Sequence, residues 1–235
     1  MIGSILCFFG VLGLVGGGAL VANEYSNGQQ TIANVEYGEV IWSDEPAESI
    51  FPDTVGGGDF ANPKYASWRR LGISPDTSCS RGLTGKTLAI AERVGCKAVL
   101  RATYVDPTGD MLATVALVVL PEDGSKRQEL AEAYGDLEAE GTVAPLPVPG
   151  TLAAGWKGDG RSGVALRTTG GEHLPYAVAV TTGAVDGRRV AGNLPGAWGD
   201  ELDVSEDRAS WFGEAEILAS LFQSHMDYLQ LGGTR

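Results

Sequence analysis

The residues whose types and spacing could support nucleotide chemistry lie between Cys79 and Cys96, where the chain reads CSRGLTGKTLAIAERVGC. Gly85, Lys86 and Thr87 match the end of the phosphate-binding motif G-x-x-x-x-G-K-[ST], in which backbone amides and the lysine hold the phosphates of a nucleotide. A genuine motif of this kind would make the chain an ATPase or a GTPase.

The surroundings of this GKT argue against a nucleotide partner. Ser80 occupies the position that the first glycine of the motif requires, and the preceding SPDTSC contains a proline where a buried strand is needed. The later stretch VALVVLPED resembles a Walker B strand, with Glu122 and Asp123 just past its end. We nevertheless predict that residues 85–87 only begin a helix.

The other residues that could do chemistry are scattered. His173 lies in a GGEHLP turn and His225 on the last predicted helix, and no G-x-S-x-G motif places a serine near either of them. The acidic loop 199–207 lacks the glycine and the terminal glutamate of a calcium loop, and no C-x-x-C or H-E-x-x-H occurs. We therefore predict no catalytic residues, no metal and no cofactor.

Composition and charge narrow the classes of partner. The 235 residues are 43% hydrophobic, which is typical of a chain that folds, and the formal net charge is −13. Residues 1–63 contain eight acidic residues and no lysine or arginine. Phosphate backbones are bound by clustered basic residues, so this charge predicts that nucleic acid is not a partner.

The N-terminus predicts a membrane span. Residues 2–22 are uncharged and, at about 1.5 Å per residue, are long enough to cross a hydrocarbon core of about 30 Å. A secretory signal peptide cleaved before Asn23 is the alternative, but the run exceeds a usual signal core. Gly13 and Gly17 form a G-x-x-x-G pattern, which predicts a helix-packing contact in the bilayer.

The soluble part is expected outside the cytoplasm, because basic residues accumulate on the cytoplasmic side of a span and none follows this one for some forty residues. Beyond the predicted span the chain has just two cysteines, Cys79 and Cys96. An even number of cysteines in an oxidising compartment favours a disulfide, and a reduced buried pair is the alternative.

Hydrophobic periodicity predicts an α+β domain, an antiparallel sheet with helices on one face. Strands are predicted at 65–73, 97–105, 111–120, 163–169 and 175–183, and helices at 84–94, 125–139 and 211–231. The first six elements match the ferredoxin-like split β-α-β order. The last helix is long and amphipathic, with apolar residues at Trp211, Ala215, Leu218, Phe222 and Leu229. It would add to the same helical layer or reach back along the membrane-proximal segment.

We expect three regions: an anchor at 1–22, an acidic juxtamembrane segment at 23–63, and the extracytoplasmic domain at 64–235. Ser43 is expected to cap a short helix within the second region. Trp156 and Trp198 lie in glycine-rich segments, where an exposed ring would offer a binding contact. The alternative is a ring folded back on the edge of the core.

The motifs SIFPDTVGG, WRRLGISPDTSC and LRATYVDPTG resemble a set of uncharacterised single-pass membrane proteins of high-GC actinobacteria, over residues 46–185. The resemblance implies an extracytoplasmic domain bridged by Cys79 and Cys96, sometimes found alongside type VII secretion components. It implies no activity. The expected function is a non-enzymatic interaction or accessory domain with a protein partner in the membrane or envelope. A ligand-binding sensor module and an envelope hydrolase are the alternatives.

Overall fold

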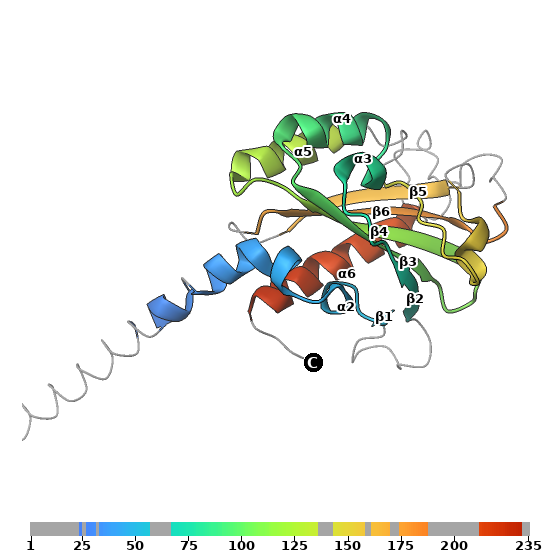
Figure 1. Cartoon of the computed structure of the whole chain (residues 1–235), viewed down its shortest axis with the longest axis horizontal. Helices are drawn as coiled ribbons and strands as arrows, with labels where there is room; N and C mark the ends of the chain where they lie inside the picture. The colour runs from blue at the N-terminus through green and yellow to red at the C-terminus, as the bar shows by residue number, and fades with distance from the viewer. Residues whose placement is uncertain are drawn as a thin grey trace, which may run out of the picture.

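The computed structural model describes residues 24, 27–31, 33–56, 67–135, 143–157, 161–169, 174–187 and 212–231. Within these residues the chain forms one antiparallel sheet of six strands, with helices packed on it and a long C-terminal helix (Figure 1). The α+β class predicted from the sequence is confirmed.

The predicted elements are found close to their expected positions. The strands are β1 (Thr54–Val55), β2 (Trp68–Ile73), β3 (Ala98–Val105), β4 (Met111–Val119), β5 (Arg161–Thr168) and β6 (Tyr176–Ala184). The helices are α2 (Ala47–Ile50), α3 (Cys79–Gly82), α4 (Gly85–Val94), α5 (Gly124–Gly135) and α6 (Phe212–Gln230), with a 3-10 helix, η1, at Leu152–Gly155. Residues 33–44 are also helical.

The strand order differs from the ferredoxin-like one, so that expectation is wrong. The order is β1-β2-β3-β4-β6-β5, and every neighbouring pair is antiparallel. In the split β-α-β arrangement another strand separates the two strands that a helix connects, whereas β2 and β3 are direct neighbours. Because β6 is buried along its whole length, it takes the inner place beside β4. The edge position falls to β5, which carries the exposed Arg167.

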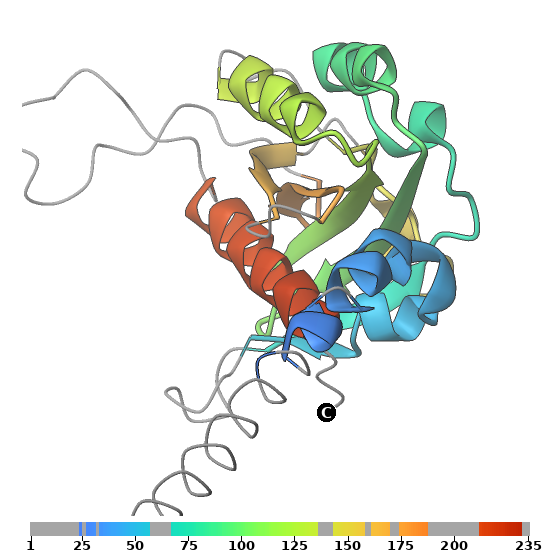
Figure 2. The ribbon, with the colours of Figure 1, turned by 90° about the vertical axis from the view of Figure 1, so that its left-hand side faces the viewer.

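Helices cover both faces of the sheet, not one face as the sequence analysis expects (Figure 2). Alternate side chains of β3 show why. Leu100 and Tyr104 belong to a first core, which α6 covers, whereas Val99 belongs to a second core, which α4 and α5 cover. Both faces of the central strands are apolar, and each therefore needs a covering layer.

The segment that precedes the sheet is part of the first core. Within residues 33–56, which we call the N-terminal arm, Ile41 and Phe51 are completely buried. The ring of Phe51 packs 6.0 Å from that of Phe222 on α6. The predicted boundary at 64 therefore does not separate the arm from the domain. Ser43 is not a helix cap either, because its hydroxyl donates to Val40 O and Pro46 precedes α2.

The second face is covered at one end by α3, α4 and α5 and in its middle by residues 143–148, which we call the crossing segment. Thr103, Thr114 and Thr181 lie opposite one another on three adjacent strands. Their hydroxyl groups hydrogen-bond to main-chain groups of the crossing segment at 2.7 to 3.1 Å. A row of hydroxyls thus replaces apolar contacts where this segment crosses the sheet.

Gly82 allows α3 to approach β3, which yields a first prediction. A Cβ at this position would lie 2.4 Å from Val99 Cγ1 and 2.6 Å from Val99 Cβ. Gly82→Ala should therefore lower the free energy of unfolding by about 1–3 kcal/mol, as overpacking does. Gly155→Ala is the matched control, since its Cβ would meet nothing within 4 Å. Equal denaturant midpoints for the two variants would contradict this packing.

Candidate interaction site

The GKT stretch does not form a phosphate-binding loop in the structure. Gly85, with φ +57°, opens α4, and Thr87 is buried. The element before it is the short helix α3 and not a buried strand. At the end of β4, Glu122 forms an ion pair with Lys97. Asp123 accepts a hydrogen bond from Ser125 N, 2.9 Å away, and hydrogen bonds from Ser125 lower its pKa.

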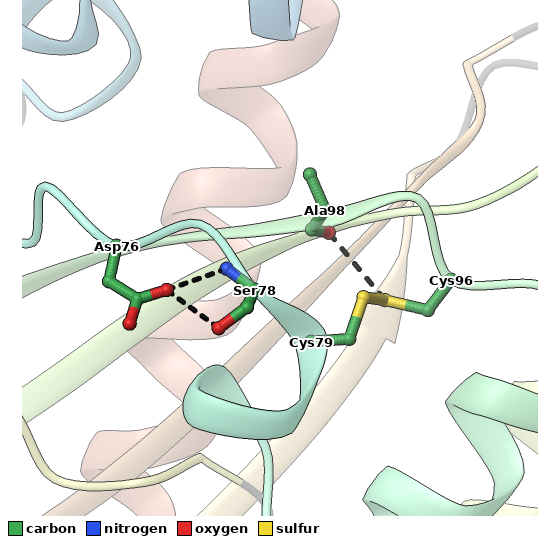
Figure 3. Close-up of a disulfide and its surroundings, with 5 residues drawn as sticks. All are labelled: Asp76, Ser78, Cys79, Cys96 and Ala98. Carbon is green, nitrogen blue, oxygen red and sulfur yellow. Dashed lines mark hydrogen bonds between the residues drawn. A yellow bond between two sulfur atoms is a disulfide. The ribbon is translucent and has the colours of Figure 1, made fainter.

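The disulfide between Cys79 and Cys96 is present, as predicted (Figure 3). It links the start of α3 to the residue that follows the C-terminal cap of α4, and the two Cα atoms are 6.4 Å apart. Before α3, Asp76 accepts hydrogen bonds from the hydroxyl and the amide of Ser78, and these lower its pKa. The bridge therefore ties the loop of residues 74–84 to the edge of the second core.

Trp156 is not the exposed contact that its glycine-rich setting suggests. The side chain is buried, and its Nε1 donates a 2.8 Å hydrogen bond to Thr114 Oγ1. The alternative expectation, a ring folded onto the core, is the correct one. Gly13, Gly17, Trp198, His173 and the acidic loop 199–207 lie outside the described residues.

His225 lies on α6 at the contact with the arm. Its Nε2 is 2.7 Å from the carbonyl oxygen of Ser49, and its ring meets that of Phe222 edge-on at 6.4 Å. His225 therefore contacts the main-chain carbonyl group of Ser49 and not its hydroxyl group. This geometry orients the imidazole for holding the arm.

The contact between the arm and the domain is the extensive polar site that the sequence analysis missed. Side chains of four elements bind main-chain carbonyl groups along the arm. They are Tyr176 of β6 at Gly38, Tyr104 of β3 at Pro52, Arg70 of β2 at Phe51, and His225 and Gln230 of α6 at Ser49 and Asn34. Main-chain acceptors carry no sequence signature, so no motif could have identified them.

Buried hydroxyl groups are the central members of this contact. The Tyr176 hydroxyl donates to Gly38 O at 2.7 Å and accepts from Trp42 N at 3.3 Å. Burial raises the pKa of Tyr176 and of Tyr104, so both groups keep the proton that they donate. Gly38 lies close to α6 and to the segment before β6, since a Cβ there would lie 2.9 Å from Gln230 Nε2 and 3.0 Å from Leu174 Cδ2.

The outer side of α6 carries a second candidate surface. Ile217, Tyr228 and Leu231 have exposed fractions of 52%, 40% and 72%. Ile217 and Tyr228 lie on α6, and at about 100° per residue their offset of 11 places them on one side of the helix, while Leu231 directly follows its last residue. We call these three residues the outer face of α6. The predicted inner stripe is confirmed for Ala215, Leu218, Phe222 and Leu229, which are buried, and the outer face is a second apolar set on the same helix.

A second prediction tests the contact between the arm and the sheet. Tyr176→Phe removes the hydroxyl that bridges Gly38 O and Trp42 N, which should lower the free energy of unfolding by about 1 kcal/mol. Amide hydrogen exchange in residues 33–44 should become faster. Tyr228→Phe, at an exposed position, should change neither quantity. Unchanged exchange in Tyr176→Phe would mean that the arm docks without this hydroxyl.

A third prediction concerns pH. Burial, together with the hydrogen bond to Glu45 and the charges of Glu45 and Asp44, raises the pKa of Tyr37 from 10.0 to about 12. Between these values the folded state binds more protons than the unfolded state, so stability falls as the pH rises from 10 to 12 and is fully present below 10. In Tyr37→Phe the free energy of unfolding should fall less steeply over this range. Identical slopes would show that Tyr37 titrates as it does in the unfolded chain.

In the ranges that the structure describes, no three His, Cys, Asp or Glu residues lie together as metal ligands would. Among those same residues no helix is long and apolar enough to cross a membrane, and the predicted span at 2–22 lies outside them. No protein-family model, no curated protein and no solved structure matches this chain.

Proposed function

We propose that this chain is a non-enzymatic interaction domain, anchored by its N-terminal segment to the cytoplasmic membrane of a bacterium and facing outward. It would act as an accessory of an envelope or secretion complex. The observation that carries this proposal is the docking of the N-terminal arm in the first core, which joins the domain to the chain leading from the predicted anchor.

The disulfide supports the proposed extracytoplasmic location. Disulfides persist in extracytoplasmic compartments and are rare where thiols are kept reduced. The bond between Cys79 and Cys96 closes a separation of 17 residues, a loop size for which the expected stabilisation is about 3 kcal/mol. The disulfide is therefore consistent with an oxidising, extracytoplasmic location.

The docking of the arm supports a role in which the orientation of the domain is set. Its main chain is bound at five places between Asn34 and Pro52, by side chains of β2, β3, β6 and α6. Only about ten residues separate the end of the uncharged run at Ala22 from the start of the arm. A flexible tether would leave the domain free to rotate, whereas a docked helix holds the surface of the domain at a set height and orientation.

The outer face of α6 is the surface that we assign to the partner protein. α6 also binds the arm, since Gln230 Nε2 donates to Asn34 O at 3.4 Å, so this helix and the arm are held together. An exposed apolar stripe at helical spacing fits an apolar ridge on a partner. With a net charge of −13 on this chain, basic residues are expected to flank that ridge.

The fourth prediction tests this assignment with the full chain, tagged and solubilised from native membranes. The double variant Ile217→Asp, Tyr228→Asp places charges on the outer face of α6. The amount of a defined co-purifying protein should therefore fall at least tenfold relative to the wild type. Leu152→Asp is the matched control, since Leu152 is 51% exposed but lies in η1, away from α6. It should retain the partner as the wild type does.

Further experiments distinguish the ways in which this proposal could fail. A chain beginning at Asn23 should keep the partner if the contact lies in the domain and lose it if the contact lies in the predicted span. Alkylation under denaturing, non-reducing conditions should leave Cys79 and Cys96 unmodified, and their modification would overturn the location. A partner retained equally by both aspartate variants, or no partner for any chain, would overturn the interaction proposal.

A further inference from the structure

A run of alternating prolines continues the crossing segment. Residues 144–150 read APLPVPG and belong to no helix or strand, and we call residues 145–149 the proline ridge. Each residue from 144 to 149 is either a proline or directly precedes one. Proline fixes its own φ angle, and the residue before a proline is driven to an extended conformation. The sequence alone therefore holds this stretch extended, as it does in proline-rich recognition segments.

The residues between the prolines attach the ridge to the sheet. Leu146 N donates to Thr114 Oγ1 at 3.1 Å, and Leu146 O accepts from Thr103 Oγ1 at 2.7 Å. Val148 packs against Gly72 of β2, where an added Cβ would lie 2.9 Å from Val148 Cγ1. Leu146 and Val148 are therefore committed to the fold, and they fix the position of the ridge on the second face.

The prolines form the solvent side of the ridge. Pro147 and Pro149 are exposed, and Pro145 is half-buried. Among the described residues, no donor binds the carbonyl oxygen of Pro145 or of Pro147, although Leu146 O between them is bound. Past the last proline, Gly150 turns the chain with φ +75°, and a Cβ there would meet nothing within 4 Å. The ridge thus offers two proline rings and two acceptors on a surface with room for approach.

Holding the crossing segment does not require the prolines. Its hydrogen bonds to side chains of the sheet are made by Val143, Ala144 and Leu146. What the prolines add is stiffness, because they remove conformations that a free chain would otherwise sample. A segment that is already extended loses little conformational entropy when a partner binds it. Stiffness combined with exposed rings favours a recognition role over a purely connecting one.

The chemistry of the ridge specifies the kind of partner. Extended proline-rich segments dock into grooves lined with aromatic side chains, which pack against the proline rings. A tryptophan N–H or a tyrosine O–H in such a groove can donate to the carbonyl groups of Pro145 and Pro147. Residues 144–150 contain no charged side chain, so the ridge offers nothing that would bind the phosphates of nucleic acid or of anionic lipid. A groove on another protein is therefore the occupant that fits.

We propose that the proline ridge binds an aromatic-lined groove of a second protein. The rings of Pro147 and Pro149 fill the groove, and donors in the groove bind Pro145 O and Pro147 O. The ridge lies on the second face of the sheet, whereas α6 covers the first. The proposal therefore goes beyond the interaction that we assign to the outer face of α6, and one domain can hold two partners at once.

The fifth prediction tests the ridge in the full chain, in native membranes, with a photo-cross-linking amino acid in place of Leu152. Leu152 is 51% exposed and lies just past the ridge, so all three prolines stay in place. Irradiation should join the chain to one defined protein, at a peptide that contains tryptophan, tyrosine or phenylalanine. The double variant Pro147→Ala, Pro149→Ala should lower the yield at least fivefold. Pro46→Ala is the matched control, because Pro46 is also exposed but precedes α2, and it should keep the wild-type yield.

Two further measurements separate binding from folding. A synthetic peptide of residues 143–150 should compete for the cross-link, whereas the same peptide with alanine in place of its prolines should not. The melting temperature of the double proline variant should stay within a few degrees of the wild-type value, and Ile217→Asp, Tyr228→Asp should leave the cross-link unchanged. The proposal is overturned by an unchanged yield in the double proline variant or by equal competition from both peptides. It is also overturned by no cross-link, or by one formed only within this chain or with a second copy of it.

Discussion

Burial of the central strands on both faces is the constraint on which the rest of the structure depends. The strands β3, β4 and β6 are buried along nearly their whole length, so neither face of the sheet can be left to solvent. The first face is covered by α6 and the N-terminal arm, and the second by α4, α5 and the crossing segment. The arm belongs to the fold because it completes the cover that α6 provides on the first face.

The two faces use different means to hold what covers them. On the first face, the rings of Phe51, Tyr104 and Phe222 pack together, and hydroxyl groups reach past them to the main chain of the arm. On the second face, threonines and Arg101 hold a chain that has no regular secondary structure of its own. The buried peptide groups of an irregular segment need hydrogen-bond partners, and the row of polar side chains on the sheet supplies them. The row therefore specifies where the crossing segment lies.

Local patterns predicted the elements, and long-range pairing decided what those patterns could not. Gly95 ends α4 with φ +93°, as a helix-terminating glycine does, and the DPTGD turn joins β3 to β4 as its residues indicate. The place of β6 beside β4, the burial of Trp156 and the docking of Ile41 each depend on a partner distant in the sequence. The site was missed for the same reason, since the acceptors of Tyr176 and Arg101 are main-chain carbonyls.

The distribution of charge links the two faces. The first 63 residues contain eight acidic residues and no lysine or arginine, whereas Arg81 and Arg101 lie on the second face, where the disulfide ties α3 to the core. The N-terminal arm and the side chain of Arg101 therefore lie on opposite faces of one sheet. The strands between them are shared, because Leu100 contributes to the first core one residue before Arg101 turns to the second face. The same strand, β3, therefore carries the Tyr104 hydroxyl that binds the arm and the Arg101 guanidinium that binds the crossing segment, which gives the two faces a physical route for coupling.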